Sequence, residues 1–508
     1  MPIMRKTENE VFKMKNKTEI KTWGALKASG YQPKDIKTEL RDNLMDALKN
    51  GKKIFPGILG YENTVIPDLQ RAILSRHNIN LLGLRGQAKT RIARQMTELL
   101  DEYIPVIEGS EINDDPFGPL SYYGREILAT KGDEAPIAWL HRDDRFIEKL
   151  ATPDVTVADL IGDIDPIKAA NLKISYSDER AIHYGLIPRS NRCIFVINEL
   201  PDLQARIQVA LFNILQEGDI QIRGFRMRLP LDIQFVFTAN PEDYTNRGSI
   251  VTPLKDRIQS QIVTHYPKDL ATSRKITAQE AGSDSARDSF VEIPELLRNI
   301  IEQISFEARE SEYVDAKSGV SARLSISALE NLVSTAERRA LINREKKTIA
   351  RITDLWGTVP AINGKIELVY EGEQEGPVSV ARFLINQAIR SQFVNYFPDP
   401  ERFKRSKENN PYLSLLDWFN NEGEVDLFMD DTQAALEKKL FAVKGLKELV
   451  DQYYKKQSAE EKVLLMEFVL YGLAAYSQLN RDTLDQHVLF KDLFSSVFNS
   501  EEEDFGLN

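Results

Sequence analysis

The sequence predicts an α/β fold in which helices cover both faces of a parallel sheet, followed by a helical region. Short β-type apolar runs at residues 104–107, 193–197 and 233–238 each precede polar turn residues and helical patterns. A further apolar run ends at Leu82 and leads through a glycine-containing turn into a helix. Strands that alternate with helices in this way are typical of a three-layer parallel sheet.

Length and composition narrow the class of protein. A chain of 508 residues is too long for one compact core, and 42% hydrophobic with 28% charged residues excludes fibrous and wholly disordered classes. The net charge of −11 disfavours nucleic acid as a partner. The single cysteine, Cys193, indicates a reducing, cytoplasmic compartment, and Glu467 interrupts the longest apolar stretch, so no membrane span is expected.

The N-terminal segment, residues 1–54, is expected to be a helical lead-in, because apolar residues recur at helical spacing from Ile36 to Leu48. A second helix is expected to open at Pro67 and to stop near Asn78. The apolar run that ends at Leu82 follows directly.

The turn after this run is the most informative feature of the chain, with the sequence NLLGLRGQAKTR over residues 80–91. Small residues let backbone N–H groups curl around a phosphate, Lys89 reaches its outer oxygens, and Thr90 holds Mg²⁺. Ala88 stands where the strict pattern has glycine. A helical backbone accepts alanine, so the loop survives this change only if Ala88 already lies on the helix side of the turn. ATP with Mg²⁺ is the predicted ligand. The expected binding residues are Gly83, Leu84, Arg85, Gly86, Gln87, Ala88, Lys89 and Thr90.

A second strand ends in an acid, as expected for the strand that faces the nucleotide. Residues 192–200 read RCIFVINEL, so Glu199 follows the buried run and is the candidate general base for an attacking water. Asn198 is the candidate second residue of the metal site, with an amide in place of the more usual aspartate. Taken alone, an Asn-Glu pair after a strand is more often a helix N-cap with a solvated acid.

Three further polar residues complete the set of catalytic candidates. Asn240 follows the strand at 233–238 and could sense the γ-phosphate, although an Asn-Pro pair also forms a simple turn. Arg257 is the candidate arginine finger toward a neighbouring subunit, the alternative being a solvated charge. Arg323 opens a later helix and is the candidate link between nucleotide state and domain closure.

After about residue 270 the pattern turns helical. A break near Trp356, a β-prone stretch at 361–370 and a turn-rich stretch at 371–377 mark a boundary between modules, and Ser458 with Glu461 forms a capping box. The expected helices cover residues 293–307, 325–343, 378–393, 431–454 and 458–476.

The order of these motifs resembles that of the AAA+ ATPases of the magnesium chelatase I-subunit and MoxR group. Residues 159–165 (DLIGDID) and 184–192 (YGLIPRSNR) are similar to segments that precede the acidic strand in that family. The resemblance extends over residues 55–345. It implies a P-loop AAA+ core over residues 55–270 and a helical lid domain over 271–360. The helical patterns further along the chain predict a mostly helical extension over 361–508, which matches no recognisable module.

The resemblance also implies a function. A hexameric ring would hydrolyse ATP and remodel or activate a partner with a von Willebrand factor A domain. Hairpins at the insertion before the acidic strand and at 219–230 would line the pore of the ring. The second hairpin carries Arg223, Arg226 and Arg228, a basic strip that suits an acidic segment, unless these are only solvated charges.

Other functions stay open at this point. A nucleotide-gated scaffold with little hydrolysis is motivated by Asn198, and the ATPase subunit of a true metal chelatase is a narrower variant. An enhancer-type transcription activator would need a signature loop and a helix-turn-helix, and neither is recognisable in the sequence. A DNA helicase is disfavoured by the acidic charge.

Overall fold

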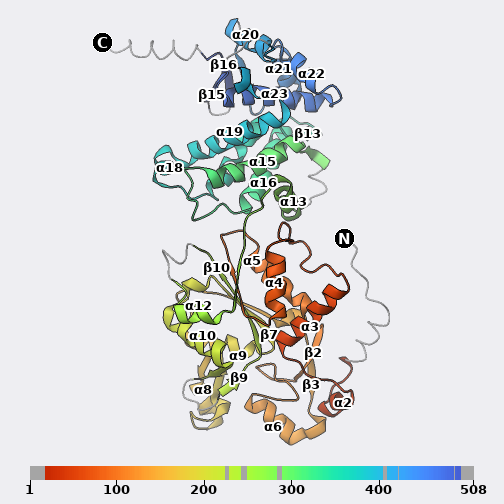
Figure 1. Cartoon of the computed structure of the whole chain (residues 1–508), viewed down its shortest axis with the longest axis vertical. Coiled ribbons are helices and arrows are strands. Elements are labelled where there is room, and N and C mark those ends of the chain that lie inside the picture. Colours follow the sequence, from red (N-terminus) through yellow and green to blue (C-terminus); the bar gives the residue numbers. More distant parts are fainter. Residues whose placement is uncertain are drawn as a thin grey trace, which may run out of the picture. The chain divides into compact units, whose positions relative to one another are not determined.

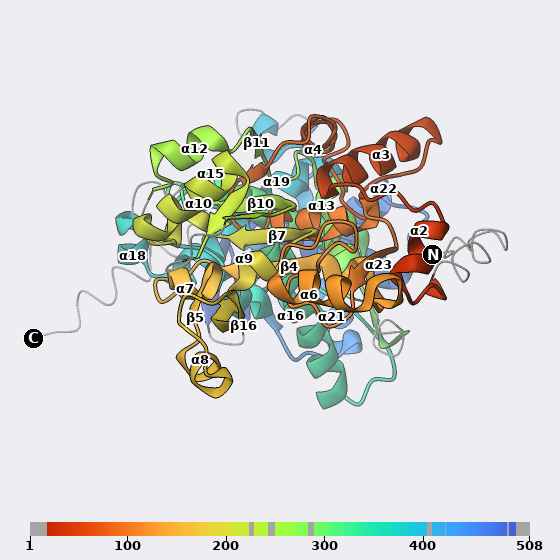
Figure 2. The same ribbon diagram turned by 90° about the horizontal axis from the view of Figure 1, so that it is seen from below.

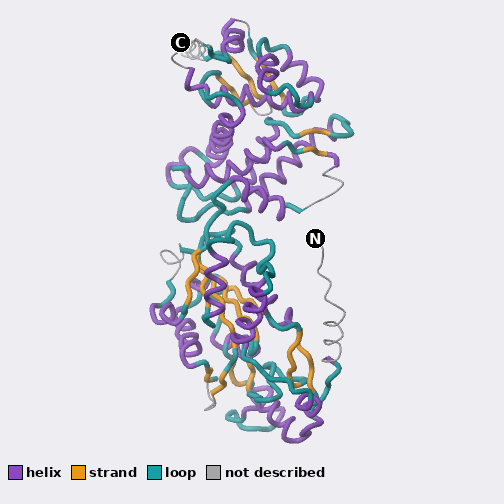
Figure 3. Tube along the Cα trace, turned by 45° about the vertical axis from the view of Figure 1, so that its right-hand side comes forward, coloured by secondary structure: helices purple, strands orange, loops and turns teal. Residues whose placement is uncertain are grey.

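The computed structural model describes residues 18–222, 228–241, 249–282, 289–403, 409–421, 423–484 and 487–493. The chain divides into two compact units, Met1–His265 and Tyr266–Asn508. Strands concentrate in the first unit and helices dominate the second (Figure 3). The two units are described separately below.

A five-stranded parallel sheet forms the centre of the first unit (Figure 1). Its strand order is β11-β1-β10-β7-β4. The strand before the phosphate loop, β1, therefore lies between β11 and β10, and β10 is the strand that precedes Asn240. This is the three-layer P-loop AAA+ core that the sequence predicts. The strands are β1 (Ile79–Leu82), β4 (Phe146–Leu150), β7 (Cys193–Asn198), β10 (Ile233–Ala239) and β11 (Ser260–Val263).

Apolar side chains cover both faces of this sheet, which is why β7 reads as a continuous apolar run. Ile194 and Val196 join the core under α3 (Ile36–Lys49), α4 (Val65–Leu74) and α5 (Lys89–Gln95). Phe195 and Ile197 point the other way, into the core under α10 (Ala205–Glu217) and α12 (Thr252–Arg257). Figure 2 shows β4, β7 and β10 side by side in the middle of this unit.

The remaining elements of the first unit are connections and insertions. They are α2 (Trp23–Ala28), η1 (Met96–Leu99), β2 (Tyr103–Ile107), α6 (Tyr122–Lys131), η2 (Gly132–Glu134), β3 (Ile137–His141), η3 (Arg142–Arg145), α7 (Val157–Leu160), β5 (Gly162–Ile164), α8 (Pro166–Leu172), η4 (Glu179–Ala181), β6 (Ile182–Tyr184), α9 (Leu186–Arg189), η5 (Leu200–Asp202), β8 (Asp219–Gln221) and β9 (Arg228–Pro230).

One predicted strand lies outside the main sheet. The apolar run at 104–107 forms β2, which pairs antiparallel with β3 instead. The strands that take part in the sheet in addition to the predicted ones are β4 and β11. Neither is recognisable as an apolar run, because Glu148 and Lys149 interrupt β4, and Ser260 and Gln261 open β11.

Two hairpins occur where the family resemblance implies them. β5 and β6 pair antiparallel on either side of α8. Glycine is required at the base of this hairpin, at Gly162 on β5 and at Gly185 directly after β6. A Cβ on Gly162 would lie 2.3 Å from the carbonyl oxygen of His183, and one on Gly185 would lie 2.6 Å from that of Leu160. β8 and β9 form the second hairpin, with Arg228 exposed on β9. Arg223 and Arg226 lie outside the described residues.

The second unit is mostly helical, as predicted. Its elements are α13 (Leu270–Glu280), β12 (Val291–Glu292), α15 (Glu295–Glu310), α16 (Arg323–Ile342), β13 (Thr348–Ile349), η6 (Thr353–Thr358), α17 (Val359–Asn363), α18 (Tyr370–Glu375), α19 (Pro377–Tyr396), η7 (Pro400–Phe403), α20 (Leu413–Asn421), β14 (Val425–Phe428), α21 (Gln433–Phe441), α22 (Leu446–Tyr453), α23 (Ala459–Ala475), β15 (Asn480–Leu484) and β16 (His487–Lys491). One apolar core extends from Val291 to Phe490.

Some expectations for this unit are wrong in detail. The stretch at 361–370 is not a strand, because α17 covers its start and only Leu368 makes an isolated bridge, to Val314. The turn-rich stretch at 371–377 is largely the helix α18. The helix expected at 431–454 is two helices, which Gly445 separates with a φ of 86°. A small antiparallel sheet, β14-β16-β15, accompanies these helices.

Glu467 has a structural explanation in α23. Its side chain is fully buried, and its carboxylate accepts hydrogen bonds from the backbone N–H groups of Ile352 at 3.0 Å and Thr353 at 2.8 Å. The acid therefore ties α23 to the start of η6 inside the core. Within the described part of the chain, no helix combines the length and apolar character that a membrane span requires.

Candidate functional site

The phosphate loop follows β1 and is packed tightly at its first glycine. Gly83 donates its N–H to the carbonyl oxygen of Ala239 on β10 at 3.1 Å. A Cβ on Gly83 would lie 1.9 Å from Thr264 Oγ1 and 2.2 Å from Gln87 Oε1, two atoms that themselves share a hydrogen bond of 2.6 Å. Only glycine fits at this position.

Ala88 does not have the helical backbone that would accept alanine without strain. Its φ and ψ are 58° and 18°, in the left-handed region, and it is the N-cap residue of α5. A Cβ in this region approaches the following carbonyl oxygen and costs about 1–2 kcal/mol. The alanine therefore occupies a glycine conformation under strain.

Lys89 connects the loop to the neighbouring strand. Its ammonium donates to the carbonyl oxygens of Gly83 and Leu84, the latter at 3.0 Å, and to Asn240 Oδ1 at 2.6 Å. The lysine of the loop and the amide after β10 are thus brought together, although 151 residues separate them in the chain. Thr90 is exposed one residue further along α5.

The carboxyl ends of β7 and β10 share a hydrogen-bonded group. The Thr238 hydroxyl donates to Asn198 Oδ1 at 3.1 Å and accepts from the backbone N–H of Glu199 at 3.1 Å. Glu199 itself has a φ of 55° and a ψ of 49°, so the chain turns sharply at the candidate base. Glu199 is the N-cap residue of η5, but its side chain makes no capping hydrogen bond. Left-handed backbone at a non-glycine residue is concentrated at functional sites.

Two groups of residues at this site have no motif in the sequence. The Tyr61 hydroxyl lies 3.1 Å from the carbonyl oxygen of Gln87 and 2.7 Å from that of His265. Thr64 Oγ1 lies 2.8 Å from His265 Nε2. The Tyr61 hydroxyl therefore links the loop, at Gln87, to His265, the last residue of the first unit. The second group is Glu148 on β4, which accepts a hydrogen bond from the Asn198 amide.

The two candidate arginines belong to other helices. Arg257, at the end of α12, donates to Gln216 Oε1 at 3.1 and 3.2 Å, and its guanidinium carbon lies 4.4 Å from the centre of the Phe212 ring. Its side chain remains 30% exposed. Arg323 is exposed at the start of α16 in the second unit.

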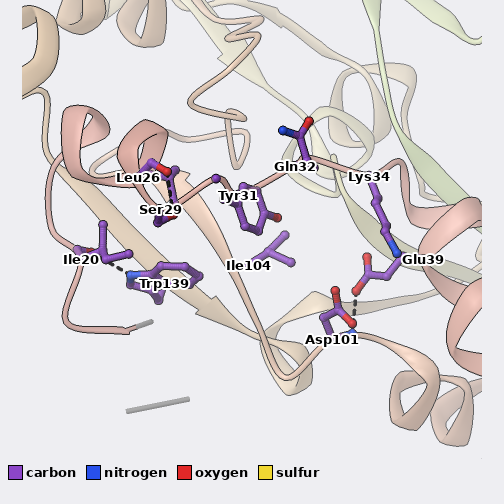
Figure 4. Close-up of a pocket in the computed structure, with 11 residues that line it drawn as sticks. Ile20, Leu26, Ser29, Tyr31, Gln32, Lys34, Glu39, Asp101, Ile104 and Trp139 are labelled. Atoms are coloured by element: carbon purple, nitrogen blue, oxygen red, sulfur yellow. Dashed lines mark hydrogen bonds between the residues drawn. The ribbon is translucent and has the colours of Figure 1, made fainter. Parts of the chain in front are cut away.

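A cavity of about 530 Å³ lies apart from the loop, between α2, the start of α3 and β2 (Figure 4). Tyr31, Ile104 and Trp139 form its apolar side, and Trp139 donates its indole N–H to the carbonyl oxygen of Ile20 at 2.9 Å. At its other end Glu39 pairs with the buried Arg145 at 2.7 Å. The lining acids thus already have partners, and the cavity is part of the framework around α3.

Cys193 has no role in the chemistry of the site. It is fully buried in β7, and burial raises the pKa of its thiol to about 12. The thiol therefore stays protonated at neutral pH and packs as a small apolar group. Among the described residues, no group of three histidine, cysteine or acidic side chains could hold a metal ion by itself.

The chain is similar to known proteins over part of its length. No protein-family model matches it. The magnesium-chelatase 38 kDa subunit of Cereibacter sphaeroides is 24% identical over 220 residues, which are 42% of this chain and 58% of that protein. The same subunit of Rhodobacter capsulatus is 24% identical over 242 residues, 47% of this chain and 63% of that protein. The chain thus spans about three-fifths of the length of these curated relatives, and the resemblance to the chelatase I-subunit group is confirmed.

Solved structures add little to this result. A complex between subunits BchI and BchD of magnesium chelatase aligns at 18% identity and a TM-score of 0.33, covering 63% of this chain and 98% of that chain. Hsp104 with casein aligns at 12% identity and a TM-score of 0.33, covering 61% and 48%. Since these TM-scores are below 0.5, the assignment of the fold depends on the strand order given above.

Proposed function

We propose that this protein is an ATPase that works as a ring, like the magnesium chelatase I-subunit and MoxR group, and remodels or activates a partner protein. The observation that carries the proposal is the 2.6 Å contact between the Lys89 ammonium and Asn240 Oδ1. It joins the phosphate-binding lysine to the candidate sensor of the γ-phosphate at one edge of the sheet. If the loop were only a structural turn, its lysine would not have to meet the amide that follows β10.

The donors and acceptors at this edge fit ATP with Mg²⁺. Lys89 has three oxygen partners that it would exchange for phosphate oxygens. Thr90 and Asn198 offer the hydroxyl and amide oxygens of a Mg²⁺ site, and Glu199 offers a carboxylate that accepts the proton of an attacking water. Bound Mg²⁺ neutralises phosphate charge. The residues of the chain position the nucleotide and move the proton.

The position of the candidate finger supports the proposed ring. Arg257 is held by Gln216 and Asp256 and remains partly exposed, which suits a guanidinium that acts on the nucleotide of a neighbouring subunit. Arg323 would couple nucleotide state to movement of the second unit. A hexamer is the proposed assembly, in the cytoplasm.

The partner is proposed from the relatives. One of the similar structures is a complex between subunits BchI and BchD of magnesium chelatase. We infer a corresponding partner for this chain, a protein with a von Willebrand factor A domain, which the β5–β6 and β8–β9 hairpins would contact. Service as the ATPase subunit of a true metal chelatase would be a special case of this role.

A nucleotide-gated scaffold is the second candidate function. Two observations favour it, the strained Ala88 in the loop and the amide of Asn198 in place of a carboxylate. Both would weaken the binding of Mg²⁺ with nucleotide and slow turnover without preventing assembly.

Steady-state ATP hydrolysis and particle mass test the proposal. The wild-type chain, Lys89→Ala and Glu199→Gln are measured with and without ATP, and Lys131→Ala on the exposed face of α6 serves as a matched control. We expect the wild type and the control to hydrolyse ATP and to form a ring. Lys89→Ala should lose binding, and Glu199→Gln should bind ATP and assemble without turnover. Assembly without wild-type turnover above the Glu199→Gln level would favour the scaffold.

A further inference from the structure

Three polar side chains meet near the carboxyl end of the sheet, on the face that α5 covers, with Glu148 two residues before the position on β4 that pairs with Asn198. Val236 and Val196 pack with Ile92 of α5 in one core, and each lies two residues before Thr238 or Asn198. Since side chains two residues apart share a face, Thr238 and Asn198 point toward α5. Glu148 is in register with Val196 on the neighbouring strand and shares this face.

The Asn198 amide bridges the other two side chains. Its nitrogen donates to Glu148 Oε1, and its oxygen accepts from the Thr238 hydroxyl at 3.1 Å. A carboxylate accepts only, so these partners fix which end of the amide faces Glu148. An aspartate at position 198 would place two carboxylates in direct contact, and both could not remain ionised cheaply.

We propose that Glu148 carries the negative charge of the Mg²⁺ site that an aspartate at position 198 would otherwise supply. In this arrangement the carboxylate is on β4, the strand next to β7, and the Asn198 amide on β7 holds it by a hydrogen bond. The inference rests on the proposed binding of nucleotide with Mg²⁺. Mg²⁺ retains several of its waters in such sites, so a carboxylate one strand away acts by accepting hydrogen bonds from these waters.

Arg94 gives Glu148 a second contact and an alternative explanation. Its guanidinium lies 3.0 Å from Glu148 Oε2, four residues after Thr90 on α5. The Arg94 side chain is 67% exposed, so water weakens this ion pair. If Glu148 served only to fasten β4 to α5, removal of Arg94 would have the same effect as removal of Glu148.

Binding of a fluorescent ADP to the full-length chain tests the inference without turnover. The affinity is measured in Mg²⁺ and in EDTA for the wild type, Glu148→Gln, Arg94→Gln and Glu148→Gln with Asn198→Asp, after thermal melts show that each variant is folded. We expect Glu148→Gln to reduce the enhancement by Mg²⁺ about tenfold, with affinity in EDTA unchanged. The double variant should restore the enhancement, and Arg94→Gln should retain it.

The outcomes separate the two proposals. Failure of the wild type to bind ADP under either condition would overturn the proposed function itself. Wild-type binding that Mg²⁺ strengthens, with the same enhancement in Glu148→Gln, would overturn only the role of Glu148. Equal losses in Glu148→Gln and Arg94→Gln, or no recovery in the double variant, would also overturn it, because the position of the charge would then not matter.

Discussion

Replacing Ala88 with glycine should stabilise the first unit, although alanine-to-glycine changes usually destabilise. Ala88 has a φ of 58°, and relief of the left-handed conformation returns about 1–2 kcal/mol. The greater backbone freedom of glycine in the unfolded chain removes about 0.4–1 kcal/mol of this. The expected net gain is about 0–1.6 kcal/mol and is centred near 0.8 kcal/mol, which is roughly 2–3 °C in melting temperature for a unit of this size.

Thermal unfolding of the full-length chain measures this gain, with Ala129→Gly as the matched control. Ala129 is exposed inside the ordinary helix α6, so its replacement should cost about 0.5–1 kcal/mol. The two variants should therefore move the first transition in opposite directions. A loss in Ala88→Gly that equals the loss in Ala129→Gly would refute the assignment of strain to the loop.

Two further predictions concern stability. Gly83→Ala should lower the melting temperature by several degrees because its Cβ would lie 1.9 Å from Thr264 Oγ1, whereas Gly364→Ala, whose Cβ would lie 3.4 Å from its nearest neighbour, should have little effect in the same thermal melt; similar melting temperatures would contradict the close packing. Burial raises the pKa of Asp232 to about 6, so the folded state holds a proton between pH about 4 and 6 that the unfolded state releases. The free energy of unfolding should fall as the pH rises through that window, and Asp232→Asn should remove this fall in urea titrations at pH 4 to 7.

The central part of the fold is predictable because its signals are local. The run from Cys193 to Ile197 is buried on both faces, so no polar residue interrupts it, and the loop after Leu82 has a motif whose spacing reflects its geometry. The edge strands are different. β4 and β11 bury only part of their side chains, and their exposed positions carry charged and polar residues that erase the apolar pattern.

The parts of the candidate site that sequence reasoning missed depend on pairing between distant segments. Glu148 lies 50 residues before Asn198 and Tyr61 lies 204 residues before His265. Nothing near either residue in the chain indicates its partner, since the contacts arise from the order of strands in the sheet. The left-handed conformation of Ala88 could not be predicted for another reason. Alanine has a lower energy in the helical region than in the left-handed region, so its sequence gives no sign of a positive φ.

The two departures from the nucleotide-binding pattern differ in their physical character. The strain at Ala88 lies in its backbone, and the methyl side chain cannot offset it with a capping hydrogen bond. The loss of a carboxylate at position 198 is matched by Glu148 on the next strand, and the hydrogen bond between them depends on the amide. The pairing of Asn198 with Glu148 therefore removes one of the two observations that favour the scaffold, and leaves Ala88 as the position at which turnover should be slowed.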